Sequence, residues 1–308
     1  MRLIITIPAY NEEATISKVI DEIPKKIKGI DEIEVLVIDD GSTDNTAKIA
    51  EAHGAEVIRH ASNLGLAKAF RTGLYSSLEK GAGIILNTDA DFQYNQKQIP
   101  LLLKPILEGR ADIVLGSRFK GSIEAMPIHK KLGNILASRV LSFVTGYKIS
   151  DGQTGFRAFS RESALRMNLW SDYTYTHETL LHAAENSLVI EEVPVDFRKR
   201  ADKSRLISSI WLYAFNASKT LFNYYLYYKP LQLFGFLGAI LILSGLISGM
   251  RVLVHFFNTG LVSPYIPTAV LTSVFLIVGF ILIMIGLVAD LVKHSRKAEE
   301  EIIYLLRK

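Results

Sequence analysis

The sequence predicts a Rossmann-like α/β domain with a mainly parallel sheet, followed by an interfacial helix and two transmembrane helices. In the front half of the chain, short apolar runs alternate with segments whose apolar residues recur at helical spacing, which is the pattern of a parallel sheet covered by helices. Polar turns follow these runs, so the side chains available for chemistry gather at the carboxyl edge of the sheet. Two long uncharged apolar stretches occupy the chain after residue 231.

The individual elements follow from apolar runs, helical spacing and turn residues. Strands are predicted at residues 3–7, 34–38, 56–59, 83–86 and 113–116, with 190–195 as an edge strand closed by Pro194. Helices are predicted at residues 14–27, 47–52, 66–78 and 127–146, with another that begins at His177. The first of these helices is expected to end at Lys28 and Gly29.

Two carboxylates, Asp89 and Asp91, follow the apolar run 83–86. Residues i and i+2 of an extended segment point the same way, so both carboxylates address one site, and their repulsion favours a bound cation. With Gln93 nearby, hard oxygen ligands suit Mg²⁺ or Mn²⁺ shared with phosphate oxygens. An isolated Asp-x-Asp is more often a solvated turn, so this hypothesis depends on the motifs around it.

Composition limits the function classes. The 308 residues include 49% hydrophobic residues, carry a net charge of +4 and contain no cysteine, which excludes disulfides and thiolate metal sites. The mild positive charge and the lack of a Lys/Arg-rich run favour phosphate ligands or an anionic membrane surface over nucleic acid. Residues 3–7 are too few for a signal-peptide core, so the front domain is expected in the cytoplasm.

Four motifs occur in a characteristic order: Pro8-Ala9-Tyr10-Asn11-Glu12, Asp39 to Asp44, Asn63-x-Gly65 and Asp89-x-Asp91. In this order and spacing the chain resembles the family-2 glycosyltransferases, which have the glycosyltransferase-A fold. The resemblance implies a nucleotide-sugar donor and a metal held by Asp91 and Gln93, with Asp89 beside it. The implied donor-binding residues are Pro8, Ala9, Tyr10, Glu12, Asp39, Asp40, Asn63, Gly65, Lys68, Ala90, Arg200 and Arg205.

A second set of residues concerns the acceptor. On the predicted helix 127–146, a stripe about 80° wide contains Lys131, Asn134, Ser138 and Ser142, and by itself this pattern favours a solvated face. Together with Arg118 and the segment 151–157, it resembles the polyprenyl-phosphate branch of the family, which includes the dolichol-phosphate mannose synthases. That resemblance implies acceptor-phosphate binding by Arg118, Lys131, Asn134 and Ser138. Asp151 is assigned a catalytic role, in orienting the acceptor or taking a residual proton, with a structural Asp-Gly turn as the alternative.

Residues 198–206 are similar to the basic loop that closes over the donor diphosphate in that branch, and a membrane-facing basic patch is the alternative.

Aromatic residues between 210 and 228 predict an interfacial helix. Residues 233–250 and 268–289 are long enough to span a bilayer, and the connector 256–267 has no Lys or Arg. By the positive-inside rule, both termini are cytoplasmic. The tail is predicted to self-associate or to lie on the surface as an amphipathic helix.

The predicted domains are a catalytic domain at 1–206, a juxtamembrane helix at 207–230, two spans at 231–291 and a tail at 292–308. The predicted function is metal-dependent, inverting transfer of mannose, glucose or N-acetylglucosamine from a GDP- or UDP-linked donor to dolichyl or polyprenyl phosphate.

Two alternative functions are a processive polysaccharide synthase and a non-catalytic membrane scaffold. A processive polysaccharide synthase would need a Gln-x-x-Arg-Trp motif and more spans, neither of which is found. A non-catalytic scaffold would be expected to lose the carboxylates.

Overall fold

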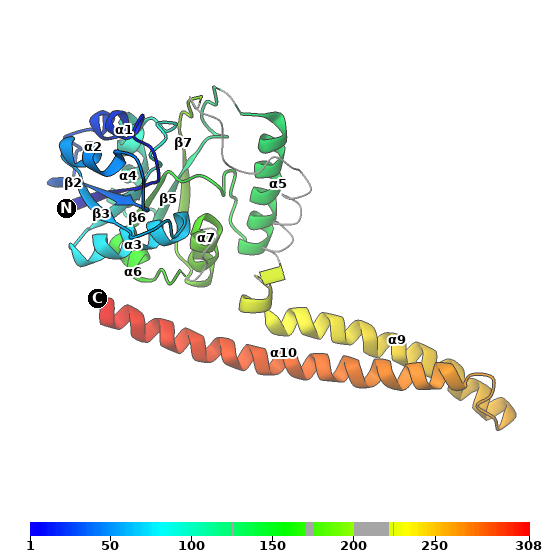
Figure 1. Ribbon diagram of the computed structural model, residues 1–308. Coiled ribbons are helices and arrows are strands. Elements are labelled where there is room, and N and C mark those ends of the chain that lie inside the picture. Colours follow the sequence, from blue (N-terminus) through cyan, green and yellow to red (C-terminus); the bar gives the residue numbers. More distant parts are fainter. Residues whose placement is uncertain (125, 170–174, 200–221, 224) are drawn as a thin grey trace. The chain divides into compact units, whose positions relative to one another are not determined.

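The computed structural model describes the chain except residue 125, residues 170–174, residues 200–221 and residue 224. The chain divides into two compact units, Met1–Ala217 with Arg307–Lys308, and Ser218–Leu306. The first unit contains the sheet and the second contains two long helices (Figure 1). The predicted boundary between catalytic domain and juxtamembrane helix, at 206/207, lies outside the described residues.

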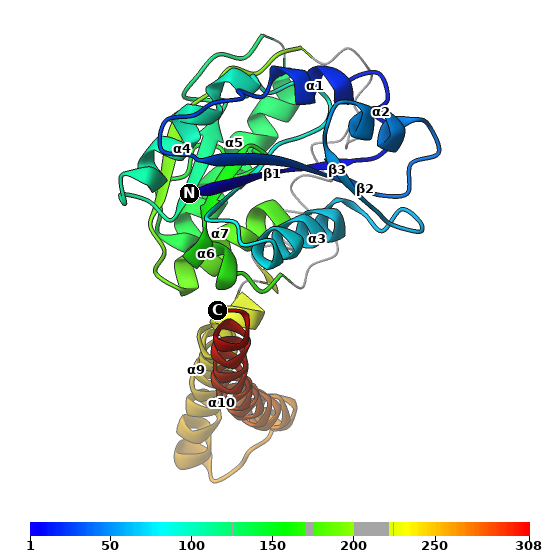
Figure 2. The ribbon, with the colours of Figure 1, turned by 90° about the vertical axis from the view of Figure 1, so that its left-hand side faces the viewer.

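The first unit is built on a seven-stranded sheet in the order β3-β2-β1-β4-β6-β5-β7. β6 is antiparallel to β4 and β5, and the other neighbouring pairs are parallel. Figure 2 shows α1 and α2 on one side of the β1–β3 part of the sheet and α3 and α6 on the other. The strands are β1 (Arg2–Ala9), β2 (Glu32–Asp39), β3 (Glu56–Arg59), β4 (Ile84–Asn87), β5 (Ile113–Ser117), β6 (Arg157–Ser160) and β7 (Ile190–Pro194).

Helices cover both faces of this sheet and bury its apolar strands. Leu3, Ile5, Ile84 and Leu86 are inaccessible to solvent, which is why β1 and β4 read as continuous apolar runs rather than alternating ones. The helices of this unit are α1 (Ile16–Glu22), α2 (Thr46–Ala52), α3 (Leu66–Glu79), the 3₁₀ turn η1 (Gln96–Gln98), α4 (Ile99–Leu107), α5 (Ile128–Thr145), α6 (Arg161–Leu165) and α7 (Tyr175–Glu185).

Register brings the polar turns to one edge. Ala9 at the end of β1 pairs with Asp39 at the end of β2, and Thr6 pairs with Asn87 at the end of β4. The segments that follow these strands therefore leave the sheet at the same edge, where ligands of open α/β sheets bind. This is the arrangement that the sequence predicts.

The prediction of a helix over 14–27 is wrong in its length. α1 ends at Glu22, because Pro24 disfavours helical geometry for the residue before it, and Ile23 is extended with φ −64° and ψ 127°. Four described elements were not predicted: η1, α4, β6 and α6. α4 consists of nearly continuous apolar residues interrupted by prolines, so it shows no helical period. β6 was interpreted only as part of the 151–157 motif.

The second unit consists of α9 (Pro230–Thr259) and α10 (Ile266–Arg307), both long and apolar enough to cross a membrane. Only 11% of the most apolar window of either helix is buried, so neither is the covered core helix of a soluble protein. The helices pack closely at two glycines, since a Cβ on Gly238 would lie 2.6 Å from the Gly279 carbonyl oxygen. α10 continues without interruption through the predicted tail.

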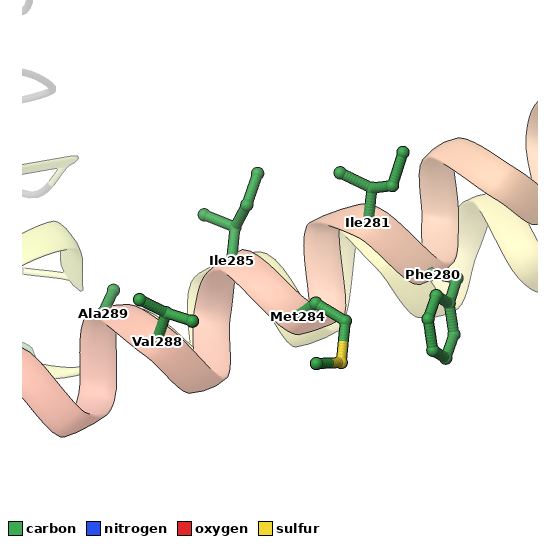
Figure 3. A pocket seen from close by; sticks show the side chains of 6 residues that line it. All are labelled: Phe280, Ile281, Met284, Ile285, Val288 and Ala289. Atoms are coloured by element: carbon green, nitrogen blue, oxygen red, sulfur yellow. The ribbon is translucent and has the colours of Figure 1, made fainter.

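Apolar side chains project from α10 along its middle. Figure 3 shows six that line a shallow groove: Phe280, Ile281, Met284, Ile285, Val288 and Ala289. None of them carries a group for acid–base, nucleophilic or metal chemistry. The groove is therefore interpreted as the surface of a membrane helix, and the site for chemistry is sought at the sheet edge.

Candidate functional site

The turn after β1 is fastened to the turn after β2. Asn11, which has a positive φ of 54°, donates its N–H to Ser42 Oγ at 2.9 Å and accepts the Thr43 N–H on Oδ1 at 2.8 Å. The Glu12 N–H is bonded to Thr46 Oγ1 at 2.9 Å. Two of the predicted donor-binding motifs therefore form one rigid wall, on which Tyr10 is exposed.

Asp39 lies at the base of this wall and is fully buried. Its Oδ1 accepts the Ser42 N–H at 3.0 Å, and Arg59 Nε lies 3.1 Å from Oδ2. Among the described residues, no donor reaches Oδ2 with hydrogen-bond geometry. A buried carboxylate oxygen in this state is suited to accept a hydroxyl from a ligand.

The carboxylate of Asp40, another predicted donor residue, bonds to groups of the protein itself. It accepts the backbone N–H groups of Leu64 and Gly65 at 2.9 and 2.8 Å and is bonded to His60 Nδ1 at 2.7 Å. Gly65, with a φ of 94°, is the N-cap of α3. Asp40 thus anchors the Asn63-x-Gly65 loop and uses both carboxylate oxygens to do so.

The other predicted donor residues lie along the same edge. Pro8 and Ala9 are buried at the end of β1, Ala90 is buried in the carboxylate turn, Asn63 is exposed and Lys68 lies in the first turn of α3. Arg200 and Arg205 lie outside the described residues. The described donor residues therefore belong to neighbouring turns, as the register of the strands predicts.

The carboxylate turn follows β4. Asp91 Oδ1 accepts the Gln93 N–H at 3.2 Å, and Phe92 between them has a φ of 59°, which is unusual for a bulky residue. Asp89 packs on Gly155, where a Cβ would lie 2.5 Å from its Oδ1. Glycine at position 155 is therefore required for the observed position of the Asp89 carboxylate.

We expect Gly155→Ala to displace the Asp89 carboxylate and to lower turnover at least about tenfold, because a contact of 2.5 Å cannot be accommodated without movement. The readout is kcat in a transfer assay, with thermal unfolding measured on the same sample. Gly235→Ala is the control, since a Cβ there meets nothing within 4 Å. Wild-type kcat in Gly155→Ala would show that the position of Asp89 does not matter.

Arg198 joins the carboxylate turn to the segment after β7. Its backbone N–H donates to the Gln93 carbonyl at 2.8 Å, and Gln93 Nε2 donates to the Arg198 carbonyl at 3.3 Å. The guanidinium makes two hydrogen bonds to Glu22, at 2.9 and 2.7 Å, and lies 4.5 Å from the centre of the Phe92 ring. Burial acts to raise the pKa of Glu22, but these bonds outweigh it and lower the pKa. This clamp was not predicted from the sequence.

The carboxylate turn fits a metal only in part. Among the described residues, no group of three or more histidine, aspartate or glutamate side chains could hold a metal ion. Asp89 and Asp91 supply hard carboxylate oxygens, which Mg²⁺ and Mn²⁺ prefer. The residues therefore fit an ion that takes its other ligands from a diphosphate, and not an ion held by protein alone.

Arg118 and Asp151 form a buried ion pair. Arg118 Nε and Nη2 donate to the two Asp151 oxygens at 2.6 and 2.8 Å, and the Arg118 N–H donates at 3.1 Å. Asp151 is fully buried and Arg118 is 8% exposed. Arg118 was predicted to bind the acceptor phosphate and Asp151 to have a catalytic role. In this structure the two side chains bond to each other.

The polar stripe of α5, predicted to contain Lys131, Asn134, Ser138 and Ser142, contacts the segment that carries Asp151. Asn134 and Ser138 are buried, so the alternative of a solvated face is wrong for these two residues, whereas Lys131 is exposed. Ser138 Oγ accepts the Gly152 N–H at 3.0 Å, next to Asp151. Lys131 lines a surface hollow that also contains Pro127. The structure brings Ser138 to the Arg118–Asp151 pair.

Arg157 is a further buried residue of this region whose role was not predicted. Its guanidinium donates to the carbonyl oxygens of Gly152, Thr154 and Thr176 and to Thr179 Oγ1, at 2.6 to 2.9 Å. Burial lowers the pKa of Arg157 to about 10, so it stays charged at neutral pH. Arg157 therefore fixes the 152–154 loop to α7.

His177 on α7 makes folding sensitive to acid. Burial and then the charge of Arg157 lower the pKa of His177 from 6.5 to about 4. The unfolded chain binds this proton first, so the free energy of unfolding should fall as the pH drops from about 6.5 to about 4. Thermal unfolding in detergent across this range should show a shallower decline for His177→Gln. The same decline in both proteins would contradict the assignment.

Comparison with known proteins agrees with this geometry. Residues 4–166 match the family described as Glycosyl transferase family 2. A UDP-N-acetylglucosamine–dolichyl-phosphate N-acetylglucosaminyltransferase of Methanococcus voltae is 34% identical over 212 residues, covering 61% of this chain and 82% of that protein. The glycosyltransferase AglJ of Haloferax volcanii is 31% identical over 294 residues, covering 92% of this chain and 91% of that protein.

The fold is similar to that of a glucosyl-3-phosphoglycerate synthase from Mycobacterium tuberculosis, solved with Mn²⁺, UDP and glucosyl-3-phosphoglycerate. The TM-score is 0.55 at 24% identity, and the match covers 72% of this chain and 79% of that chain. At this identity the likeness concerns the fold alone. It confirms the predicted glycosyltransferase-A architecture, to which α9 and α10 are added.

Proposed function

The chain belongs to glycosyl transferase family 2, and from this premise we propose that it transfers a hexosyl unit from a nucleotide diphosphate sugar to a polyprenyl or dolichyl phosphate. The observation that carries the proposal is the combination, in one chain, of a carboxylate turn at the sheet edge with two long helices whose apolar faces are exposed. The carboxylate turn suits a soluble diphosphate donor, and the two apolar helices suit a lipid acceptor. The N-acetylglucosaminyltransferase relative is named for dolichyl phosphate.

The donor is proposed to lie against the wall formed by the turns after β1 and β2. Asp39 Oδ2, buried and without a well-placed donor among the described residues, accepts a ribose hydroxyl, and Pro8, Ala9, Tyr10 and Glu12 hold the nucleoside. The Asn63–Gly65 loop, held by Asp40, and Lys68 and Ala90 complete the donor side. Arg200 and Arg205 are proposed to close over the diphosphate.

Asp91, with Gln93 and Asp89 beside it, is proposed to hold Mg²⁺ or Mn²⁺ against the diphosphate. Such an ion, when bound, neutralises the charge that develops on the departing nucleoside diphosphate without any proton transfer. Gln93 also fixes the turn to Arg198 through the bonds described above. The side chains of the turn are therefore positioned before the donor arrives, so less reorganisation is needed during transfer.

The acceptor phosphate is proposed to bind beside Arg118, Ser138 and Asn134, with Lys131 supplying charge from the exposed start of α5. A phosphate monoester has a second pKa of about 6, so it is largely dianionic at neutral pH and attacks without a strong base. Both Asp151 oxygens accept hydrogen bonds from Arg118, so Asp151 is better suited to orient Arg118 than to take a proton. A single displacement of this kind inverts the anomeric centre.

The proposed topology places the catalytic domain and both termini in the cytoplasm. Lys229 precedes the first span and Lys293, Arg296 and Lys297 follow the second, whereas the connector 256–267 has no Lys or Arg. The proposed domains are the catalytic domain 1–206, the juxtamembrane helix 207–230, the spans 231–291 and the tail 292–308. Self-association through the tail is part of this proposal.

The test is a transfer assay with purified full-length protein, labelled GDP- and UDP-sugars, Mg²⁺ or Mn²⁺, and a short polyprenyl phosphate. Label that moves into the organic phase as a lipid-linked monosaccharide supports the proposal and also identifies the sugar and the base. Label in a high-molecular-weight glycan would instead indicate a processive synthase. No transfer from any donor, in protein that still binds membranes, would indicate a non-catalytic scaffold.

A further inference from the structure

Tyr94, which follows the carboxylate turn, is a buried residue that the proposed function does not use. Its side chain is 1% exposed, and its hydroxyl meets the segment 154–155. The Gly155 N–H donates to the Tyr94 hydroxyl at 3.0 Å, and the same hydroxyl lies 3.2 Å from Thr154 Oγ1. Burial raises the pKa of Tyr94, so the hydroxyl keeps its hydrogen at neutral pH. The hydroxyl therefore accepts one hydrogen bond from Gly155 and has one hydrogen to donate to Thr154.

Both backbone polar groups of Gly155 are held by residues that flank the two carboxylates in the sequence. Asn87 Nδ2, at the end of β4, donates to the Gly155 carbonyl at 2.8 Å, and Tyr94 accepts the Gly155 N–H. Gly155 lies so close to Asp89 that an added Cβ would be 2.5 Å from the carboxylate Oδ1. Tyr94 and Asn87 therefore fix the glycine against which the Asp89 carboxylate packs.

The ring of Tyr94 extends toward the acceptor side of the site. It packs edge-on against the ring of Phe197, with the ring centres 5.3 Å apart. The Arg118 guanidinium lies 5.0 Å from the centre of the same Phe197 ring. The charges of Arg118 and Asp89 both act on the Tyr94 hydroxyl, with opposite signs. Tyr94 therefore lies between the donor-side carboxylate and the acceptor-side guanidinium.

We propose that Tyr94 is a positioning residue that aligns the Asp89 carboxylate, on the donor side, with the Arg118–Asp151 pair, on the acceptor side. This inference deepens the proposed function and rests on it. Transfer joins two substrates that are bound in different places, so a misalignment of about 1 Å slows the step even where each substrate still binds. Tyr94 belongs to neither binding site, and its effect is therefore expected in kcat rather than in either KM.

The test is Tyr94→Phe in the full-length protein, which keeps the ring but removes the acceptor of the Gly155 N–H. We expect kcat to fall about tenfold, while the KM for the nucleotide sugar and the KM for polyprenyl phosphate each stay within about twofold of the wild type. Tyr147→Phe is the matched control and should keep wild-type kcat. The Tyr147 hydroxyl donates to the Leu188 carbonyl at 2.9 Å, and Leu188 precedes the amino end of β7, at the opposite edge of the sheet. Thermal unfolding is measured on each variant, and kcat is measured below its unfolding temperature.

The double variant Tyr94→Phe with Gly155→Ala tests whether the hydroxyl acts through the glycine. If it does, the two losses overlap, and the double variant is at most about twofold slower than the slower single variant. Losses that multiply would indicate a general effect on the fold and would overturn the proposal, as would wild-type kcat in either single variant. A rise in one KM alone would place Tyr94 in the binding site of that substrate and would overturn it too. A wild-type protein that transfers no hexosyl unit would instead overturn the proposed function, and the role of Tyr94 in transfer with it.

Discussion

Asp91→Asn is expected to lower turnover by at least about a hundredfold while the protein remains folded and membrane-inserted. The substitution keeps the size of the side chain and its ability to accept the Gln93 N–H at 3.2 Å, but it removes the negative charge. A divalent ion shared with the donor diphosphate would then lose its principal protein ligand. The measurement is kcat for transfer to polyprenyl phosphate, with a titration of Mg²⁺ or Mn²⁺.

The control for this variant is Asp21→Asn, an exposed carboxylate on α1 that is bonded to His53. It removes the same charge from the same domain without touching the carboxylate turn, so it should keep wild-type turnover. Full activity of Asp91→Asn, or activity of the wild type in excess EDTA, would exclude the metal-dependent mechanism.

Arg118→Ala is expected to destabilise the protein by about 3–5 kcal/mol and to abolish transfer, because it leaves the fully buried Asp151 carboxylate without its partner. A loss of activity in this variant alone would not distinguish acceptor binding from misfolding. The double variant Arg118→Gln with Asp151→Asn separates the two roles. It keeps polar groups that can bond to each other while removing both charges.

We expect the double variant to recover most of the lost stability but not the transfer activity, and to retain donor binding, since the donor lies against other turns. Thermal unfolding measures the stability, and isothermal titration with nucleoside diphosphate measures donor binding. Recovery of activity together with stability would show that Arg118 and Asp151 serve only to hold the fold. The acceptor phosphate would then have to bind elsewhere.

The sheet and its polar edge could be predicted because each depends on short-range pattern. Buried strands appear as apolar runs, and the turns that follow them are polar wherever the sheet opens to a ligand. The pair Asp89 and Asp91 is visible for the same reason. The length of α1 could also have been predicted, since Pro24 was in the sequence and disfavours helical geometry at Ile23.

Other features depend on contacts between segments far apart in the chain. Arg198 bonds to Glu22 across 176 positions, and no local pattern links the two. Asn134 and Ser138 have the spacing of a solvated stripe, yet both are buried, and the 149–152 loop bonds to Ser138 and Ser142 on that stripe. Asp40 belongs to a donor motif, yet its oxygens are taken by the backbone of Leu64 and Gly65. In each case tertiary packing decides the role of a residue whose chemical type was already evident.

The most direct test of the central claim is a comparison of three acceptors with full-length protein in vesicles: a polyprenyl phosphate, the same polyprenol without phosphate, and a small water-soluble phosphate monoester. The donor is the nucleotide sugar that is active in the transfer assay, and the products are followed by mass spectrometry. The account predicts a single hexosyl unit joined to the polyprenyl phosphate and no product from the other two acceptors, because the site needs both the phosphate and a tail held in the membrane. Equal transfer to the soluble phosphate monoester, or to the polyprenol without phosphate, would contradict it.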